Sequence, residues 1–152
     1  ILDLRGNGGG LVDAGIKIVE MFTLKGTPII TLHYPDKPDG QKITRTDGDY
    51  SSLPIYILAD QNTASSAEII VGALQGAGRA QIIGKQTYGK NSIQLVFDLQ
   101  DGSSIHVSAA TWTLPGSPEF GPGSGIRPEI ELTPEYPADA DYIQAVLDSL
   151  NN

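Results

Sequence analysis

The sequence predicts one α/β domain, tending to α+β, in which helices cover a mostly parallel sheet and an antiparallel hairpin extends from it. Apolar strand-like runs alternate with helical patterns as far as Gly84. Beyond Lys90 the apolar period changes to two, which is typical of antiparallel strands. The chain has 152 residues, of which 39% are hydrophobic and 18% charged, so it can bury one ordinary core.

The first half of the chain supplies the strand–helix alternation. Strands are expected over residues 1–4, 27–34 and 55–59, and a helix over residues 11–23. The core face of that helix is predicted from apolar residues at helical spacing, namely Val12, Ile16, Val19 and Phe22. The polar connection at residues 35–52 contains Asp-Gly turns and leaves room for a short hairpin through residues 42–46.

The second half predicts the hairpin and the end of the domain. Residues 93–99 and 105–111 alternate on either side of an Asp-Gly turn, which indicates two antiparallel strands. Residues 115–128 are rich in Gly and Pro and predict a long surface loop without helix or strand. An edge strand is expected over residues 130–132 and a helix over residues 139–150. The predicted core face of this last helix is Ile143, Val146, Leu147 and Leu150.

The candidate catalytic residues lie between Asp60 and Gln94. The strand at 55–59 leads through a polar turn into a helical pattern that begins at Ala64, so Ser65 stands at a helix N-terminus. Glu68 follows at the spacing of a capping box, and capping alone would explain the serine. The unpaired amides of a first helical turn also point where an oxyanion would form, so Ser65 is a candidate nucleophile that needs a base.

Lysine is the candidate base. The two histidines, His33 and His106, lie in strand-like segments away from Ser65, and the chain has no cysteine. Lys90 follows a Tyr-Gly pair and precedes the apolar strand at 93–99, which tethers it beside buried structure.

Three motifs carry a resemblance to a known family. They are Leu2-Asp-Leu-Arg-Gly-Asn-Gly-Gly-Gly-Leu11, then Ser65-Ser-Ala-Glu-Ile69, and, 25 residues after Ser65, Lys90 within Thr87-Tyr-Gly-Lys-Asn-Ser-Ile-Gln94. The match continues through residues 101–103 and 125–130 and covers essentially the whole chain. On these motifs the chain resembles the carboxyl-terminal processing peptidases, also called tail-specific proteases, which are serine endopeptidases with a Ser-Lys dyad.

The resemblance assigns roles to individual residues. It implies that Ser65 is the nucleophile, that Lys90 is the general base, and that Gln94 helps to orient the lysine. It also implies an oxyanion hole made by the backbone amide of Ser66 and by that of Gly9 or Gly10.

Two departures from the family pattern are visible. Some members carry an aspartate eleven residues after the serine, where this chain has Gly76. The family often has a Pro-Ser-Gly-Arg sequence before the Gly-Ile-x-Pro segment, where residues 115–118 read Pro-Gly-Ser-Pro, so that arginine is absent. We expect activity without the aspartate, because other members also lack it.

The resemblance further implies a fold like that of the Clp protease/crotonase superfamily, with layered helices on a central sheet. It implies protein or peptide substrates with accessible carboxyl termini, no cofactor or metal, and an extracytoplasmic location, which is periplasmic, on the outer face of a membrane, or secreted. A homo-oligomer and an upstream PDZ domain in the parent protein are open. No PDZ domain is expected within residues 1–152.

Other functions fit the sequence less well. The net charge of −8 and the scattered basic residues argue against a nucleic-acid partner. The segment from Gly84 to Lys90 nearly matches a phosphate-binding loop, but a strand follows it where such a loop needs a helix. Leu11 stands where the dinucleotide-binding fingerprint needs its third glycine. A non-catalytic ligand- or peptide-binding module on the same fold is the remaining alternative.

The chain begins without methionine and directly in a strand, so we expect a catalytic-domain fragment truncated on its N-terminal side. An unpaired sheet edge should result. We therefore expect the isolated chain to fold but to be weakly active or inactive.

Overall fold

The computed structural model describes residues 1–117, 119–133 and 138–150. Its helices are α1 (Val12–Phe22), α2 (Ser66–Gly76) and α3 (Asp139–Leu150). Its strands are β1 (Leu2–Asp3), β2 (Pro28–His33), β3 (Gly40–Ile43), β4 (Ile55–Ala59), β5 (Ala80–Gly84), β6 (Ser92–Asp98), β7 (Ser104–Thr113) and β8 (Ile130–Glu131). None of the described helices has the length and apolar character needed to cross a membrane.

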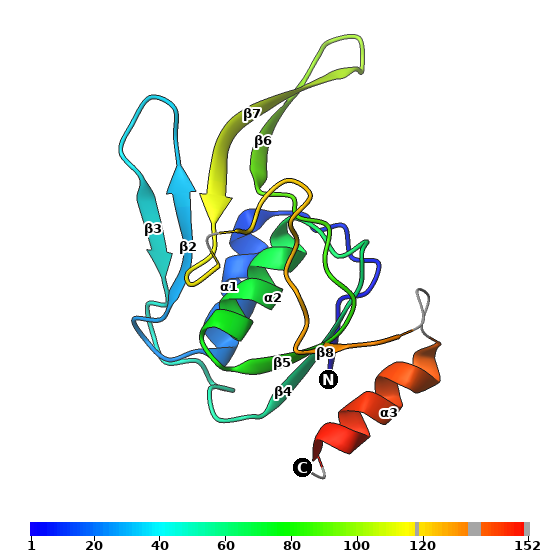
Figure 1. Ribbon diagram of the computed structural model, residues 1–152. Coiled ribbons are helices and arrows are strands. Elements are labelled where there is room, and N and C mark those ends of the chain that lie inside the picture. The colour runs from blue at the N-terminus through cyan, green and yellow to red at the C-terminus, as the bar shows by residue number, and fades with distance from the viewer. Residues whose placement is uncertain (118, 134–137, 151–152) are drawn as a thin grey trace.

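The strands form two sheets (Figure 1). The first, in the order β1-β4-β5-β8, is parallel throughout. The second, in the order β3-β2-β7-β6, is antiparallel. The predicted parallel sheet is therefore present, but the strand expected at residues 27–34 belongs to the second sheet as β2. The hairpin strand is β3, which begins two residues and ends three residues before the expected 42–46.

Helix α2 is the centre of the molecule (Figure 1). Every residue from Ser66 to Leu74 is buried, as is typical of a helix covered on all sides. Ile57 and Ile82 of the parallel sheet belong to the same core cluster as Ile69 and Leu74 of α2. The carboxyl ends of β4 and β5 lie at the edge where α2 begins, so this packing sets the position of Ser65.

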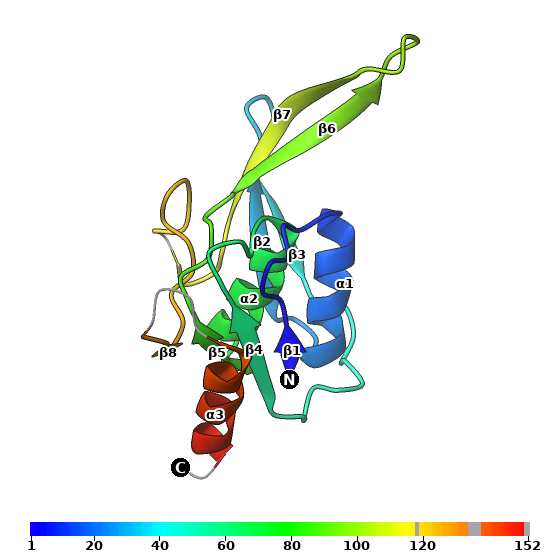
Figure 2. The ribbon, with the colours of Figure 1, turned by 90° about the vertical axis from the view of Figure 1, so that its right-hand side faces the viewer.

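Helix α3 covers the opposite face of the parallel sheet (Figure 2). Leu58 and Ile83, the neighbours of the inward-facing residues along β4 and β5, pack there with Tyr142 and Val146. The predicted α3 face was wrong apart from Val146. Its other members remain 45–60% exposed, namely Ile143, Leu147 and Leu150. The Tyr142 ring instead packs against Gly84 of β5. A Cβ added to Gly84 would lie 2.8 Å from Tyr142 Cε1, so a side chain at this position would collide with the ring.

Strands β6 and β7 extend beyond the body of the molecule as a two-stranded arm (Figures 1 and 2). Their register pairs Leu95 with Val107 and Phe97 with Ile105, so the apolar side chains share one face. All four are 45–51% exposed. The predicted hairpin is confirmed. The predicted loop at 115–128 has no helix or strand in its described residues, and Pro118 lies outside them.

Candidate active site

Ser65 occupies a strained turn between β4 and α2. It is the N-cap of α2, with φ 57° and ψ −122°. Among the described residues it is the one non-glycine residue with positive φ. Such a conformation costs roughly 1–3 kcal/mol and persists only where neighbouring contacts hold it. Hydrogen bonds from neighbouring residues must therefore hold the Ser65 turn.

The buried carboxylate of Glu68 supplies those contacts. Its side chain is completely buried, and its Oε2 accepts the amides of Ser65 at 2.8 Å and Lys90 at 2.9 Å. Its Oε1 accepts the Gly89 amide and the Thr87 hydroxyl, both at 2.6 Å. One oxygen atom thus binds the backbone of both residues of the predicted dyad.

Sequence reasoning recognised only half of this role. It predicted the capping contact from Glu68 to the Ser65 amide, which the structure contains. It missed the reach to Thr87, Gly89 and Lys90 across 19 to 22 positions of sequence. The available signal was an acidic residue surrounded by apolar helix residues, since a carboxylate buried there must find hydrogen-bond donors elsewhere.

Lys90 lies in a loop that is tied to the serine turn. The Tyr88 amide donates to the Thr63 carbonyl at 3.0 Å, two residues before Ser65. The Thr87 hydroxyl also accepts the Ile126 amide at 2.8 Å. Lys90 is half-buried and stands two residues before β6. The structure therefore brings the backbones of Ser65 and Lys90 together, while the meeting of their side chains stays a prediction.

Gln94 lies apart from this network. It is exposed, and it follows the register irregularity in β6 between Ile93 and Gln94. Its partner across the strands is Ser108 of β7. Its orienting role for Lys90 stays a prediction.

Of the two predicted glycine donors, Gly9 is the one packed against the serine turn. With φ +90°, a Cβ there would lie 2.6 Å from the Ala64 carbonyl oxygen and 2.9 Å from the Ser66 nitrogen. Only glycine fits this approach. At Gly10 a Cβ would meet nothing within 4 Å. The Gly9 amide donates to Asn7 Oδ1 at 2.9 Å, so an oxyanion at this amide would replace that side-chain oxygen.

The histidines lie in the antiparallel sheet. His33 bonds Asp39 through Nδ1 at 2.8 Å and Thr113 through Nε2 at 2.9 Å. His106 contacts Ser104 on the arm. The hydrogen bonds of both histidines are thus to residues outside the Glu68 network.

Other kinds of site find little support in the geometry. The segment that resembles a phosphate-binding loop continues into β6, so no helix N-terminus follows it. Within the ranges that the structure describes, no three His, Asp or Glu side chains gather in a way that could hold a metal ion.

Comparison with known proteins agrees with this geometry. A family model described as peptidase family S41 matches residues 1–132. The chain belongs to this family. It is 35% identical over 152 residues to the chloroplastic C-terminal processing peptidase of Tetradesmus obliquus, covering 98% of this chain and 32% of that protein. It is 37% identical over 161 residues to the carboxyl-terminal-processing protease of Synechocystis sp., covering 99% of this chain and 36% of that protein.

The S41 fold is also seen in a solved structure of the photosystem II D1 C-terminal processing protease. The match has a TM-score of 0.69 and 34% identity, and covers 96% of this chain and 38% of that one. The predicted family and the predicted layered α/β fold are thereby confirmed. The chain spans about a third of the length of the curated S41 relatives named above.

Proposed function

We propose that this chain is the catalytic core of a serine endopeptidase that cleaves proteins near their carboxyl termini, with Ser65 as nucleophile and Lys90 as general base. The observation that carries the proposal is the shared carboxylate of Glu68, which holds the amides of both residues on one oxygen atom. The strained backbone of Ser65 supports it, because such strain is concentrated at functional positions.

The proposed reaction is acyl transfer in two steps. The Ser65 hydroxyl adds to the scissile carbonyl carbon while a neutral Lys90 amine takes its proton. The tetrahedral intermediate then collapses, the peptide C–N bond breaks, and Lys90 returns the proton to the leaving amine. In the second step Lys90 takes a proton from a water molecule that adds to the acyl carbon, the ester C–O bond breaks, and Lys90 returns the proton to the Ser65 oxygen.

Charge on the substrate oxygen needs donors that are already in position. The Ser66 amide at the start of α2 is one proposed donor, and the Gly9 amide is the second. Their mutual approach supports this assignment, since the Gly9 Cα is close enough to Ser66 that no Cβ could be added. Substrate binding would then exchange the Asn7 oxygen on the Gly9 amide for the oxyanion.

The names of the relatives support the preference for carboxyl-terminal cleavage, since two of them are processing proteases of that kind. We propose accessible protein carboxyl termini as substrates and a location outside the cytoplasm or in an equivalent organellar space. Whether the working form is a homo-oligomer, and whether a PDZ domain accompanies the chain, are further questions for the full protein.

The test is cleavage of one peptide by the full protein, offered with either a free carboxyl terminus or a terminal amide, with products identified by mass spectrometry. We expect the free acid to be cleaved faster, and Ser65→Ala to abolish cleavage of both. Ser52→Ala, an exposed serine in a loop, is the matched control and should retain full rates. A wild type that binds the peptide without cleaving it would indicate a binding module, and an active Ser65→Ala would refute the nucleophile.

A further inference from the structure

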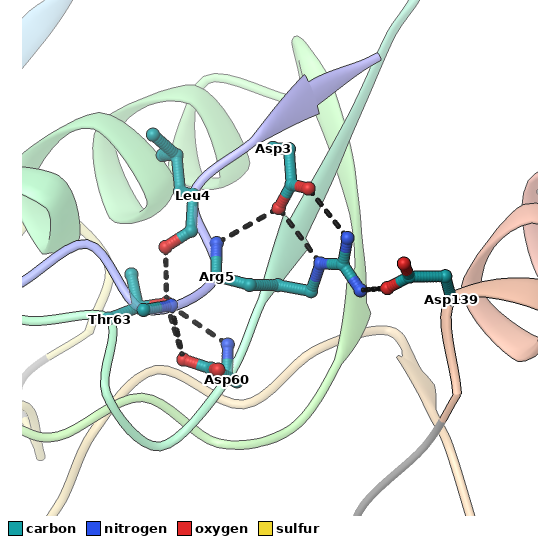
Figure 3. A network of polar contacts seen from close by, with 7 residues as sticks. Asp3, Leu4, Arg5, Asp60, Thr63 and Asp139 are labelled. Carbon is teal, nitrogen blue, oxygen red and sulfur yellow. Dashed lines mark hydrogen bonds and ion pairs between the residues drawn. The ribbon is translucent and has the colours of Figure 1, made fainter.

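The side chain of Arg5 makes contacts on two separate elements (Figure 3). Its Nε and Nη2 donate to the two oxygens of Asp3 at 2.9 and 2.7 Å, and its Nη1 donates to Asp139 at 2.6 Å. Its guanidinium carbon lies 4.4 Å from the centroid of the Tyr142 ring. The Arg5 side chain is 23% exposed, against 47% for Asp3 and 88% for Asp139, so solvent screens the contact with Asp139 more than the contact with Asp3. Arg5 therefore fastens the end of β1 to the start of α3.

The charges around Arg5 agree with this geometry. The hydrogen bonds to Asp3, and then those to Asp139, raise the pKa of Arg5 above its ordinary value. The same bonding from Arg5 lowers the pKa of the Asp3 carboxyl. Tyr142 itself is 3% exposed, which makes it a fixed surface for the guanidinium. A planar guanidinium can use its donors and its stacking face together, whereas an ammonium cannot.

The residues on either side of Arg5 are bound to the turn that carries Ser65. The Leu4 carbonyl accepts the Thr63 hydroxyl at 2.8 Å, and the Gly6 amide donates to Asp60 at 3.0 Å (Figure 3 shows Leu4, Asp60 and Thr63). One residue further on, the Asn7 carbonyl accepts the Ala64 amide at 2.9 Å. These hydrogen bonds place the backbone on both sides of Arg5 against the turn at residues 60–64, which leads into Ser65.

We propose that Arg5 is a positioning residue that holds the Gly6–Gly10 loop against the Ser65 turn, and that α3 contributes to catalysis through Asp139 and Tyr142. The proposal rests on the proposed function, because it concerns the loop that supplies the Gly9 donor. Arg5 touches neither the substrate nor the reacting atoms in this account. It acts by limiting the movement of the loop.

The test compares Arg5→Met, Arg5→Lys and Asp139→Asn with Arg45→Met, an exposed arginine that serves as the matched control. In the full protein we expect Arg5→Met to lower kcat about tenfold or more while KM changes less than about twofold, because loop displacement affects the transition state more than ground-state binding. Arg5→Lys should recover part of that loss, and Asp139→Asn should show a smaller one. Arg45→Met should match the wild type.

A second readout does not depend on activity. NMR relaxation dispersion on the Gly6 and Gly9 amides should show microsecond-to-millisecond exchange in Arg5→Met that the wild type and Arg45→Met lack. Unchanged kcat per folded molecule together with unchanged loop relaxation in Arg5→Met would overturn the proposal. An inactive wild type would overturn the proposed function alone, since the relaxation measurement still decides whether Arg5 holds the loop.

Discussion

The serine turn and the β6–β7 arm are joined by Lys90 and differ in almost every physical respect. Around Ser65 the backbone is strained, and the buried Glu68 carboxylate has four hydrogen-bond donors. Along the arm the strands pair in regular antiparallel register beyond the irregularity at Ile93 and Gln94, and the side chains of Leu95, Phe97 and Val107 are about half exposed. The comparison indicates that buried polar contacts are concentrated where the positions of Ser65 and Lys90 must be fixed. The arm is held by hydrogen bonds between its two strands.

The largest expected effect on activity comes from substitution of Lys90, which lies between the serine turn and the arm. Lys90→Arg should lose activity as completely as Lys90→Ala, by about a thousandfold or more, because a guanidinium cannot give up its proton in a protein. Gln94→Ala, on the exposed arm side, should lose much less. Peptide cleavage across a range of pH measures all three, with Lys17→Arg on the exposed face of α1 as control. Substantial activity in Lys90→Arg would exclude lysine as the base.

Removal of the Glu68 carboxylate should have a large effect on stability. Glu68→Ala leaves the amides of Ser65, Gly89 and Lys90 and the hydroxyl of Thr87 without their acceptor, and should lower the free energy of unfolding by about 3 kcal/mol or more. Urea unfolding measures this change. The exposed Glu119 offers a control, since Glu119→Ala should stay within about 0.5 kcal/mol of the wild type. An equally small change in Glu68→Ala would mean that the network contributes little.

The arm should be nearly neutral by the same measurement. Phe97→Ser removes a side chain that is 51% exposed, so the free energy of unfolding should change by about 0.5 kcal/mol or less. Ile69→Ala, in the fully buried face of α2, should cost about 2–5 kcal/mol. If Phe97→Ser were as costly as Ile69→Ala, the arm would be part of the cooperative core and the comparison would fail.

Much of the fold could be predicted because local patterns and packing agree. Period-two alternation predicted both strands of the arm, and helical spacing predicted α1 with Ile16 and Val19 on its buried face. The face of α3 could not be predicted, because the Tyr142 ring packs at Gly84 of β5 while the aliphatic Ile143, Leu147 and Leu150 stay exposed. The sheet of β2 could not be predicted either, since strand partners are set by contacts distant in sequence.

The site shows the same limit. A serine at a helix start and a lysine before a strand are local features, so Ser65 and Lys90 could be singled out from sequence. The bond from Glu68 to the lysine loop joins positions 22 residues apart and depends on how β5 returns beside α2. The positioning role proposed for Arg5 could not be predicted for the same reason, because its partner Asp139 is 134 residues away in the sequence.

The central claim is that Glu68 binds the serine turn and the lysine loop into one unit, and amide hydrogen exchange tests it most directly. We predict that the Ser65, Gly89 and Lys90 amides exchange slowly in the wild type, far more slowly than exposed turn amides such as Ser103. In Glu68→Ala all three should lose protection together, because both acceptor oxygens are removed at once. A Lys90 amide that keeps its full protection in Glu68→Ala while the Ser65 amide loses its own would contradict the claim.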